Sequence, residues 1–153
     1  MKKNRSLMVK MLVFVLLFKM TAVACYAAND PSLIGTWEIY DGSVIFQFDG
    51  SNYQVSIGIR DKTKGTYTTN AGILKTTPTH FFGNSSLGLK EKWYSKSELE
   101  EDKDFAEYCS KNGIKMTLMI EGIFETEKYT YTFDFNRLIL GQDNDIRYLW
   151  KKQ

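Results

Sequence analysis

Residues 129–135 have the sequence Tyr-Thr-Tyr-Thr-Phe-Asp-Phe, in which an aromatic side chain alternates with a polar one. Because successive side chains of a β-strand point to opposite faces, this period of two predicts a strand with one buried face and one solvated face. Aromatic side chains also suit the pleated surface of a sheet. This stretch therefore indicates a chain built from β-strands.

The same alternation recurs earlier in the chain, at residues 53–59 and at residues 114–120, where Met119 interrupts it. Hairpin dipeptides such as Asp41-Gly42 and Asp49-Gly50 separate further apolar runs. Strands spaced by roughly 8–12 residues are typical of barrels and sandwiches. We therefore predict an all-β fold, a small antiparallel up-and-down β-barrel of about eight to nine strands. The strands are expected at residues 33–40, 43–48, 52–60, 65–70, 73–79, 114–121, 124–135, 137–141 and 145–151.

One segment departs from this rhythm and predicts an inserted α-helix at about residues 97–112. Ser95 with Glu98, or Ser97 with Glu100, fits a capping box at its start, and Gly113 fits a C-cap. The preceding stretch, residues 81–94, is expected to be a long loop that covers one mouth of the barrel. The acidic side chains of the helix are expected to form a solvated face.

Residues 1–24 have the layout of a secretory signal peptide. Four basic residues lie within the first ten, residues 11–18 are an uninterrupted apolar run of eight, and Ala22-Val23-Ala24 fits a cleavage site. The run is too short to span a bilayer, which takes roughly 20 apolar residues. The whole chain has 20 Lys and Arg and 18 Asp and Glu. Five basic residues lie in the leader, so the remainder has 15 basic and 18 acidic residues, a net charge of −3 that gives no electrostatic footprint for nucleic acid.

Ala22-Val23-Ala24-Cys25 resembles the lipobox of bacterial lipoproteins, in which the Cys is lipidated, although that family usually has Leu where Ala22 stands. The resemblance implies an exported envelope protein held at a membrane by lipid on Cys25. Cleavage after Ala24 or Ala27 without lipidation, which would give a freely secreted protein, stays open. We expect a signal peptide at residues 1–24, a linker at 25–32 and one barrel domain at 33–153.

Gly35-Thr36-Trp37 opens the first expected strand and resembles the G-x-W signature of lipocalins and the wider calycin group. In that group the Trp closes one end of the barrel and an Arg or Lys of a late strand packs across it. Arg147 is the residue we match to this role, with Lys151 second. The later Asp-containing lipocalin motif is absent, and the predicted helix lies in mid-chain. The resemblance implies binding of a small hydrophobic molecule, although some members of the group inhibit proteases.

The expected inward positions are rich in bulky side chains, which can fill a small barrel completely or line an apolar pocket. Both alternatives stay open on the sequence. The candidates for the barrel interior are Trp37, Phe46, Phe48, Tyr53, Val55, Ile57, Tyr67, Met116, Leu118, Tyr131, Phe133 and Tyr148.

The sequence contains no set of residues that indicates catalysis. A Cys–His nucleophile would need Cys109 beside His80, the only histidine, and an apolar helix face predicts an inert thiol. One His and one free Cys do not make a zinc site. We therefore expect no enzyme activity, no cofactor and no metal. The leading hypothesis is binding of a small hydrophobic or amphipathic ligand in the barrel; the alternative is a filled barrel acting as a protein-interaction or protease-inhibitor module through its loops and helix.

Overall fold

The computed structural model describes residues 29–58 and 61–153. The predicted signal peptide and Cys25 lie outside these residues. Within them, eight antiparallel strands close into a barrel, because β5 pairs with both β4 and β7. The predicted barrel is therefore confirmed, and it is consistent with a calycin-like barrel. The barrel strands are β1 (Gly35–Glu38), β2 (Val44–Asp49), β3 (Asn52–Ile57), β4 (Asp61–Asn70), β5 (Ile73–Phe82), β7 (Glu127–Asp134), β8 (Arg137–Gln142) and β9 (Asp145–Lys151).

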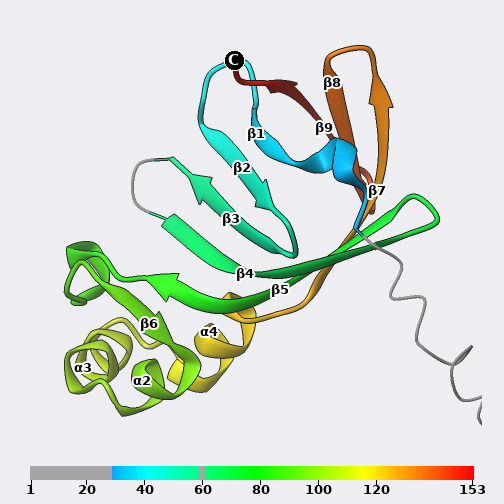
Figure 1. Cartoon of the computed structure of the whole chain (residues 1–153). Coiled ribbons are helices and arrows are strands. Elements are labelled where there is room, and N and C mark those ends of the chain that lie inside the picture. Colours follow the sequence, from blue (N-terminus) through cyan, green and yellow to red (C-terminus); the bar gives the residue numbers. More distant parts are fainter. Residues whose placement is uncertain (1–28, 59–60) are drawn as a thin grey trace, which may run out of the picture.

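Strand β5 belongs to two structural units. Its first half pairs with β7, from Ile73 to Thr76, and its last three residues pair with a short extra strand, β6 (Trp93–Ser95). Figure 1 shows the β4–β5 ribbon running out of the barrel toward β6 and the helices. The segment predicted as a loop at residues 81–94 thus contains the end of β5, the 3-10 turn η2 (Ser85–Leu87) and the start of β6.

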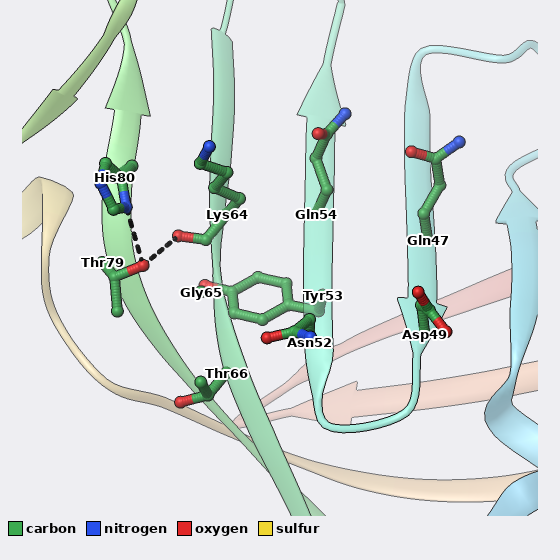
Figure 2. A pocket seen from close by; sticks show the side chains of 10 residues that line it. All are labelled: Gln47, Asp49, Asn52, Tyr53, Gln54, Lys64, Gly65, Thr66, Thr79 and His80. Atoms are coloured by element: carbon green, nitrogen blue, oxygen red, sulfur yellow. Dashed lines mark hydrogen bonds between the residues drawn. The ribbon is translucent and has the colours of Figure 1, made fainter.

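A β-bulge bends the long β4–β5 ribbon. The register shifts between Lys64, which opposes His80, and Gly65, which opposes Pro78, so Thr79 is the extra residue. The Thr79 hydroxyl donates to the Lys64 carbonyl at 3.3 Å (Figure 2). A Cβ at position 65 would lie 2.0 Å from the Thr77 carbonyl oxygen, so this crossing requires glycine. Bulges increase the local twist of a strand pair, and here the bulge directs the ribbon away from the barrel.

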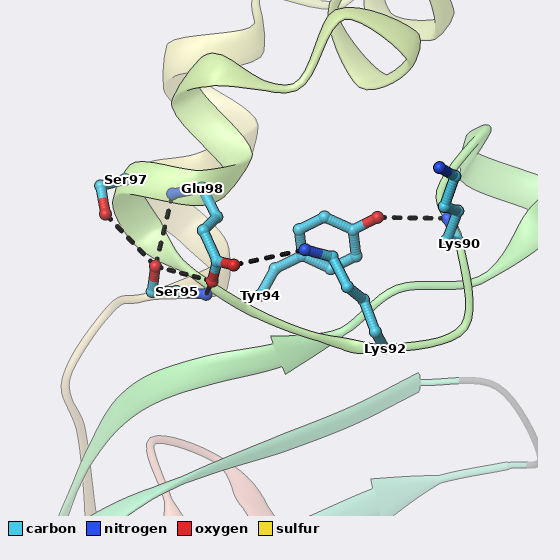
Figure 3. Close-up of polar contacts among 6 residues, drawn as sticks. All are labelled: Lys90, Lys92, Tyr94, Ser95, Ser97 and Glu98. Carbon is cyan, nitrogen blue, oxygen red and sulfur yellow. Dashed lines mark hydrogen bonds and ion pairs between the residues drawn. The ribbon is translucent and has the colours of Figure 1, made fainter.

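Three helices form a second layer with its own core beside β6: α2 (Lys96–Glu101), α3 (Lys103–Lys111) and α4 (Met116–Ile123). Figure 3 shows the predicted capping box at Ser95 and Glu98, which is confirmed. The backbone N–H of Ser95 donates to the Glu98 carboxylate at 2.8 Å and, with the Ser95 hydroxyl and Lys92, lowers the pKa of Glu98 to about 2. The helix breaks at Asp102, whose carboxylate accepts from the Phe105 N–H and caps α3. None of the helices among the described residues is long and apolar enough to cross a membrane.

The predicted strand at residues 114–121 is wrong, because most of it is α4. Met116, Met119, Ile120 and Ile123 are three or four residues apart and pack together against the second core, as one face of a helix requires. The predicted strand rested on a period of two at Ile114, Met116, Leu118 and Ile120, and two of these residues also fit the helical spacing. Met119 distinguishes the two patterns, because an apolar residue at this position breaks the period of two but belongs to the helix face. The predicted strand at 124–135 accordingly shortens to β7.

The N-terminal residues of the described chain close one end of the barrel. The Asn29 amide donates to the Gly50 and Tyr67 carbonyls at 3.2 and 3.0 Å and accepts from the Thr69 N–H at 3.1 Å. The Asp30 carboxylate accepts from the Tyr131 hydroxyl at 3.1 Å. The 3-10 turn η1 (Pro31–Leu33) follows and buries Leu33 completely. Residues 29–32 of the predicted linker therefore form a strap that is hydrogen-bonded to the barrel.

Candidate functional site

Aromatic side chains fill the barrel interior and pack on one another. The ring centroid of Phe48 lies 4.9 Å from that of Tyr67 and 5.9 Å from that of Phe46, and Phe46 lies 6.3 Å from Tyr129. The predicted interior residues that are buried or half-buried in this core are Trp37, Phe46, Phe48, Tyr53, Val55, Tyr67, Tyr131 and Phe133. The geometry therefore favours a filled barrel over a hollow one.

Four predicted interior residues lie elsewhere. Met116 and Leu118 belong to α4, where Met116 packs against the second core and Leu118 is 61% exposed. Ile57, the last residue of β3, is 51% exposed at the end of its strand. Tyr148 is 45% exposed and faces outward, because Leu149 is the residue of β9 that points into the core and neighbours on a strand alternate.

A cation lies over Trp37, as the G-x-W resemblance implies, but it belongs to Lys151, the second of the two residues matched to this role. The Lys151 ammonium lies 5.3 Å from the centroid of the Trp37 ring, and the Trp37 indole N–H donates to the Leu33 carbonyl at 2.7 Å. Arg147, the first choice from the sequence, instead pairs with Asp145 at 2.8 Å. Lys151 opposes Trp37 directly in the β1–β9 register, whereas Arg147 lies four residues earlier on β9.

The contact between Trp37 and Lys151 gives a physical reason for the glycine of the G-x-W stretch. Gly35 has φ +129°, a conformation that L side chains rarely adopt, and a Cβ there would lie 3.1 Å from Cε of Lys151. Glycine at this position thus leaves room for the lysine stem that reaches the Trp37 ring.

Two tyrosines carry polar groups into the apolar interior. Burial raises the pKa of Tyr53 to about 12, against opposing hydrogen bonds from Thr76 and Thr63. Burial and a hydrogen bond to the Glu127 carboxylate raise the pKa of Tyr129 as well. Both phenols are therefore neutral at ordinary pH and act as hydrogen-bond donors and acceptors inside the barrel.

The barrel wall has a gap between β1 and β9. Only two residue pairs, Trp37 with Lys151 and Glu38 with Trp150, join these strands. Beyond them the β1–β2 turn and β9 separate, and a pocket of about 450 Å³ lies between the two; we call it the seam pocket. Its lining comes from the turn and from β9, namely Ile39, Tyr40, Asp41, Val44, Ile146, Arg147, Tyr148 and Trp150.

The seam pocket combines an apolar surface with a few charged groups. Tyr40 is 95% exposed, and its ring contacts that of Trp150 edge-on at 6.4 Å between centroids. The Arg147 guanidinium pairs through Nε with Asp145, and within residues 29–58 and 61–153 its other N–H groups form no hydrogen bond. Hydrogen bonds from Ser43 lower the pKa of Asp41, which therefore stays anionic at the rim. The volume and lining suit a small amphipathic molecule.

His80 and Cys109 belong to different parts of the fold. His80 lies on β5, with its ring Nδ1 3.0 Å from the Thr79 hydroxyl. Cys109 is buried in the second core, where desolvation raises the pKa of its thiol. Within residues 29–58 and 61–153, no group of three or more His, Cys, Asp and Glu side chains could hold a metal ion.

No protein-family model and no curated protein matches the chain. Among solved structures, the chain is similar to the crystal structure of an uncharacterized protein from Bacteroides eggerthii DSM 20697. The TM-score is 0.47 at 11% sequence identity, and the alignment covers 78% of this chain and 99% of that chain.

Proposed function

We propose that the protein is a non-catalytic, lipocalin-like lipoprotein of the cell envelope that binds a small amphipathic molecule in the seam pocket. The observation that carries this proposal is the open β1–β9 seam with its pocket of about 450 Å³. Ligand pockets usually measure about 300–1,000 Å³, are mostly apolar and hold a few polar groups that fix orientation. Because aromatic side chains occupy the interior, we place the ligand at the wall of the barrel and not at its centre.

The side chains of the pocket favour a ligand with an apolar body and an acidic head group. Ile146, Tyr148 and Trp150 alternate with the inward side chains of β9 and are exposed apolar or aromatic residues on its outer face, where the Arg137 guanidinium lies 5.9 Å from the centroid of the Tyr148 ring. Arg147 alternates with these three side chains and therefore lines the pocket from the inner side of β9 at the open seam, where its Nε donates to Asp145. A guanidinium prefers planar oxyanions, so a carboxylate or phosphate head fits this position.

The lipocalin-like assignment rests on three residues that act together. Gly35, Trp37 and Lys151 form the closed barrel end, with the lysine ammonium over the indole. The resemblance in the sequence rested on the first two, and the third supplies the cation that the group carries on a late strand. Ligand binding by a non-catalytic barrel is what this group would imply.

A titration with a fluorescent fatty-acid analogue, followed by native mass spectrometry of the same sample, tests the ligand site. We expect saturable binding that an unlabelled fatty acid displaces and that Ile146→Ala with Tyr148→Ala weakens at least tenfold. Phe135→Ala is the matched control, because it removes an exposed aromatic side chain outside the pocket and should leave binding unchanged. Arg147→Gln should weaken a carboxylate probe more than the corresponding alcohol. Absence of any bound species and of any displaceable probe would contradict the proposal.

Lipidation at Cys25 has its own test. Metabolic labelling with a radioactive or alkyne-tagged fatty acid should mark the wild-type protein and the Cys109→Ser variant, but not Cys25→Ser. Label on Cys25→Ser, or none on the wild type, would contradict the lipid anchor. Recovery of unlabelled protein in the culture medium would favour free secretion instead.

A second candidate function is a protein-interaction module acting through the surface, for which Phe135 is the specific observation. This residue is 99% exposed at the β7–β8 turn and has φ +52°, a conformation unfavourable for a bulky residue. Exposed aromatic side chains are frequent anchors of protein interfaces. If capture of a partner from envelope extract depends on Phe135 while the fatty-acid probe fails to bind, this candidate replaces the first.

A further inference from the structure

A row of polar side chains crosses four neighbouring strands on the outer face of the barrel. Gln47 of β2 opposes Gln54 of β3, Gln54 opposes Lys64 of β4, and Lys64 opposes His80 of β5. Directly opposed residues point to the same face of a sheet, so the four side chains stand side by side, as Figure 2 shows. With strands about 4.8 Å apart, the row is roughly 14 Å long.

This row lines a groove of about 440 Å³ together with a second polar row of Asp49, Asn52 and Thr66. The outer wall of a closed barrel is generally convex, so a groove across it needs a local cause. The bulge at Thr79 supplies one, because it bends the β4–β5 ribbon.

The groove is unsuited to three common classes of ligand. The side chains that face this groove are polar, because the ring of Tyr53, its one large aromatic lining residue, packs in the barrel core, and this argues against a lipid or other apolar molecule. An added peptide strand needs a free sheet edge, and β2, β3 and β4, which form most of the groove, are paired on both sides. A polyanion needs a basic stripe, whereas Lys64 here shares the groove with Asp49.

The groove is suited to a ligand with many hydroxyl groups. Side-chain amides donate and accept at once, as hydroxyl groups also do. Among the residues drawn in Figure 2, no hydrogen bond joins the Gln47 or Gln54 amide to a neighbour. Both amides can therefore form their hydrogen bonds with a ligand.

An aromatic side chain borders the row on the side of β6. Trp93 is half-buried, with the Lys64 ammonium 4.5 Å from its ring centroid and the Phe82 ring 5.3 Å away at 73°. The negative face of an aromatic ring attracts the polarised C–H groups of a sugar ring, just as it attracts the ammonium. We propose that this groove binds a saccharide chain, with the amides of Gln47 and Gln54 as its main hydrogen-bonding groups and Trp93 as a stacking surface. This site is separate from the seam pocket and goes beyond the proposed function.

The test is a nitrogen-15 NMR titration of the purified protein with four hexasaccharides: maltohexaose, cellohexaose, chitohexaose and hexagalacturonate. Side-chain amide signals of glutamine and the indole signal of tryptophan report on the row directly. We expect at least one sugar to give saturable shifts at Gln47, Gln54 and Trp93, and the double variant Gln47→Ala, Gln54→Ala to raise its Kd at least tenfold.

Gln142→Ala is the matched control, since it deletes a glutamine of β8 that does not line the groove, and it should leave the Kd unchanged. Backbone signals elsewhere in the spectrum verify that each variant is folded. Absence of saturable shifts in the row with all four sugars overturns the proposal, as do shifts that the double variant leaves intact. The fatty-acid analogue should bind the double variant as it binds the wild type, which separates failure here from failure of the proposed function.

Discussion

The substitution Phe48→Ala tests whether the barrel is filled. Phe48 is 2% exposed, and its ring packs against those of Phe46 and Tyr67. Truncation of a buried Phe to Ala costs about 3–5 kcal/mol of stability, and aromatic pairs contribute about 0.5–1.5 kcal/mol beyond their buried area. Because the truncation removes the ring from both aromatic pairs, we expect the free energy of unfolding to fall by about 4 kcal/mol. For a domain of this size that corresponds to a fall in Tm of roughly 15 °C.

Urea unfolding followed by tryptophan fluorescence measures this change in stability, with the slope against urea concentration unchanged. The matched control is Phe135→Ala, which deletes the same atoms from a side chain that is 99% exposed and should change stability by less than about 0.5 kcal/mol. Phe48→Leu should fall between the two, at about 1.5 kcal/mol or less. If Phe48→Ala costs no more than about 1 kcal/mol, the ring faces a hollow or hydrated interior and the inference of a filled barrel is refuted.

Four further experiments test the contact over Trp37, the strap and the second core. Lys151→Met should destabilise the protein by about 0.5–1 kcal/mol, because it removes the cation over Trp37. Arg147→Met should have a smaller effect in the same urea assay. Equal effects of the two substitutions would contradict the assignment of Lys151 as the cation that packs over Trp37. Asn29→Ala removes three hydrogen bonds of the strap and should cost about 1.5–3 kcal/mol, whereas Asn144→Ala in the exposed β8–β9 turn should cost little. Burial alone would raise the pKa of Asp30, but hydrogen bonds from Ser32 and Tyr131 outweigh it and lower that pKa below 3.8. The ionised carboxylate therefore stabilises the fold above pH 4, and this stabilisation is lost as the pH falls through the folded pKa. The stability difference between wild type and Asp30→Asn should accordingly shrink in acid, and a difference independent of pH would count against this role of Asp30. In a Cys25→Ser background, the buried thiol of Cys109 should react with a disulfide reagent far more slowly in the native state than in urea, and equal rates would show that the second core is open.

The sequence predicted those features whose signal is local. The run Tyr129 to Phe135 marked β7, the Ser95–Glu98 pair marked a helix start, and Gly35 with Trp37 marked the first strand of the barrel. Each depends on backbone periodicity or on residues close together in the chain, so the residue pattern itself carries the information.

The remaining features depend on tertiary contacts. On β9, the set Ile146, Tyr148, Trp150 is more apolar than the alternating set that contains Leu149, so hydrophobicity alone chose the wrong inward face. Lys151 is exposed, but its long stem lets the ammonium lie over the Trp37 ring, a contact that residue type alone does not specify. The seam pocket follows from a β1–β9 register of two residue pairs, which no pattern in either strand specifies.

The double partnership of β5 makes the two cores mechanically dependent on each other. Leu74 belongs to the barrel core and Phe81, on the same strand, to the helical core, so stress on one unit passes along a single backbone to the other. If the helices detach first, β5 loses β6 and presents the backbone edge at residues 80–82, beside the aromatic rings of Phe81 and Phe82. Bare edges of this kind recruit strands from other molecules. Because β6 covers this edge and α2 follows it directly, weakening the helical layer is expected to produce aggregates before it produces unfolded monomers.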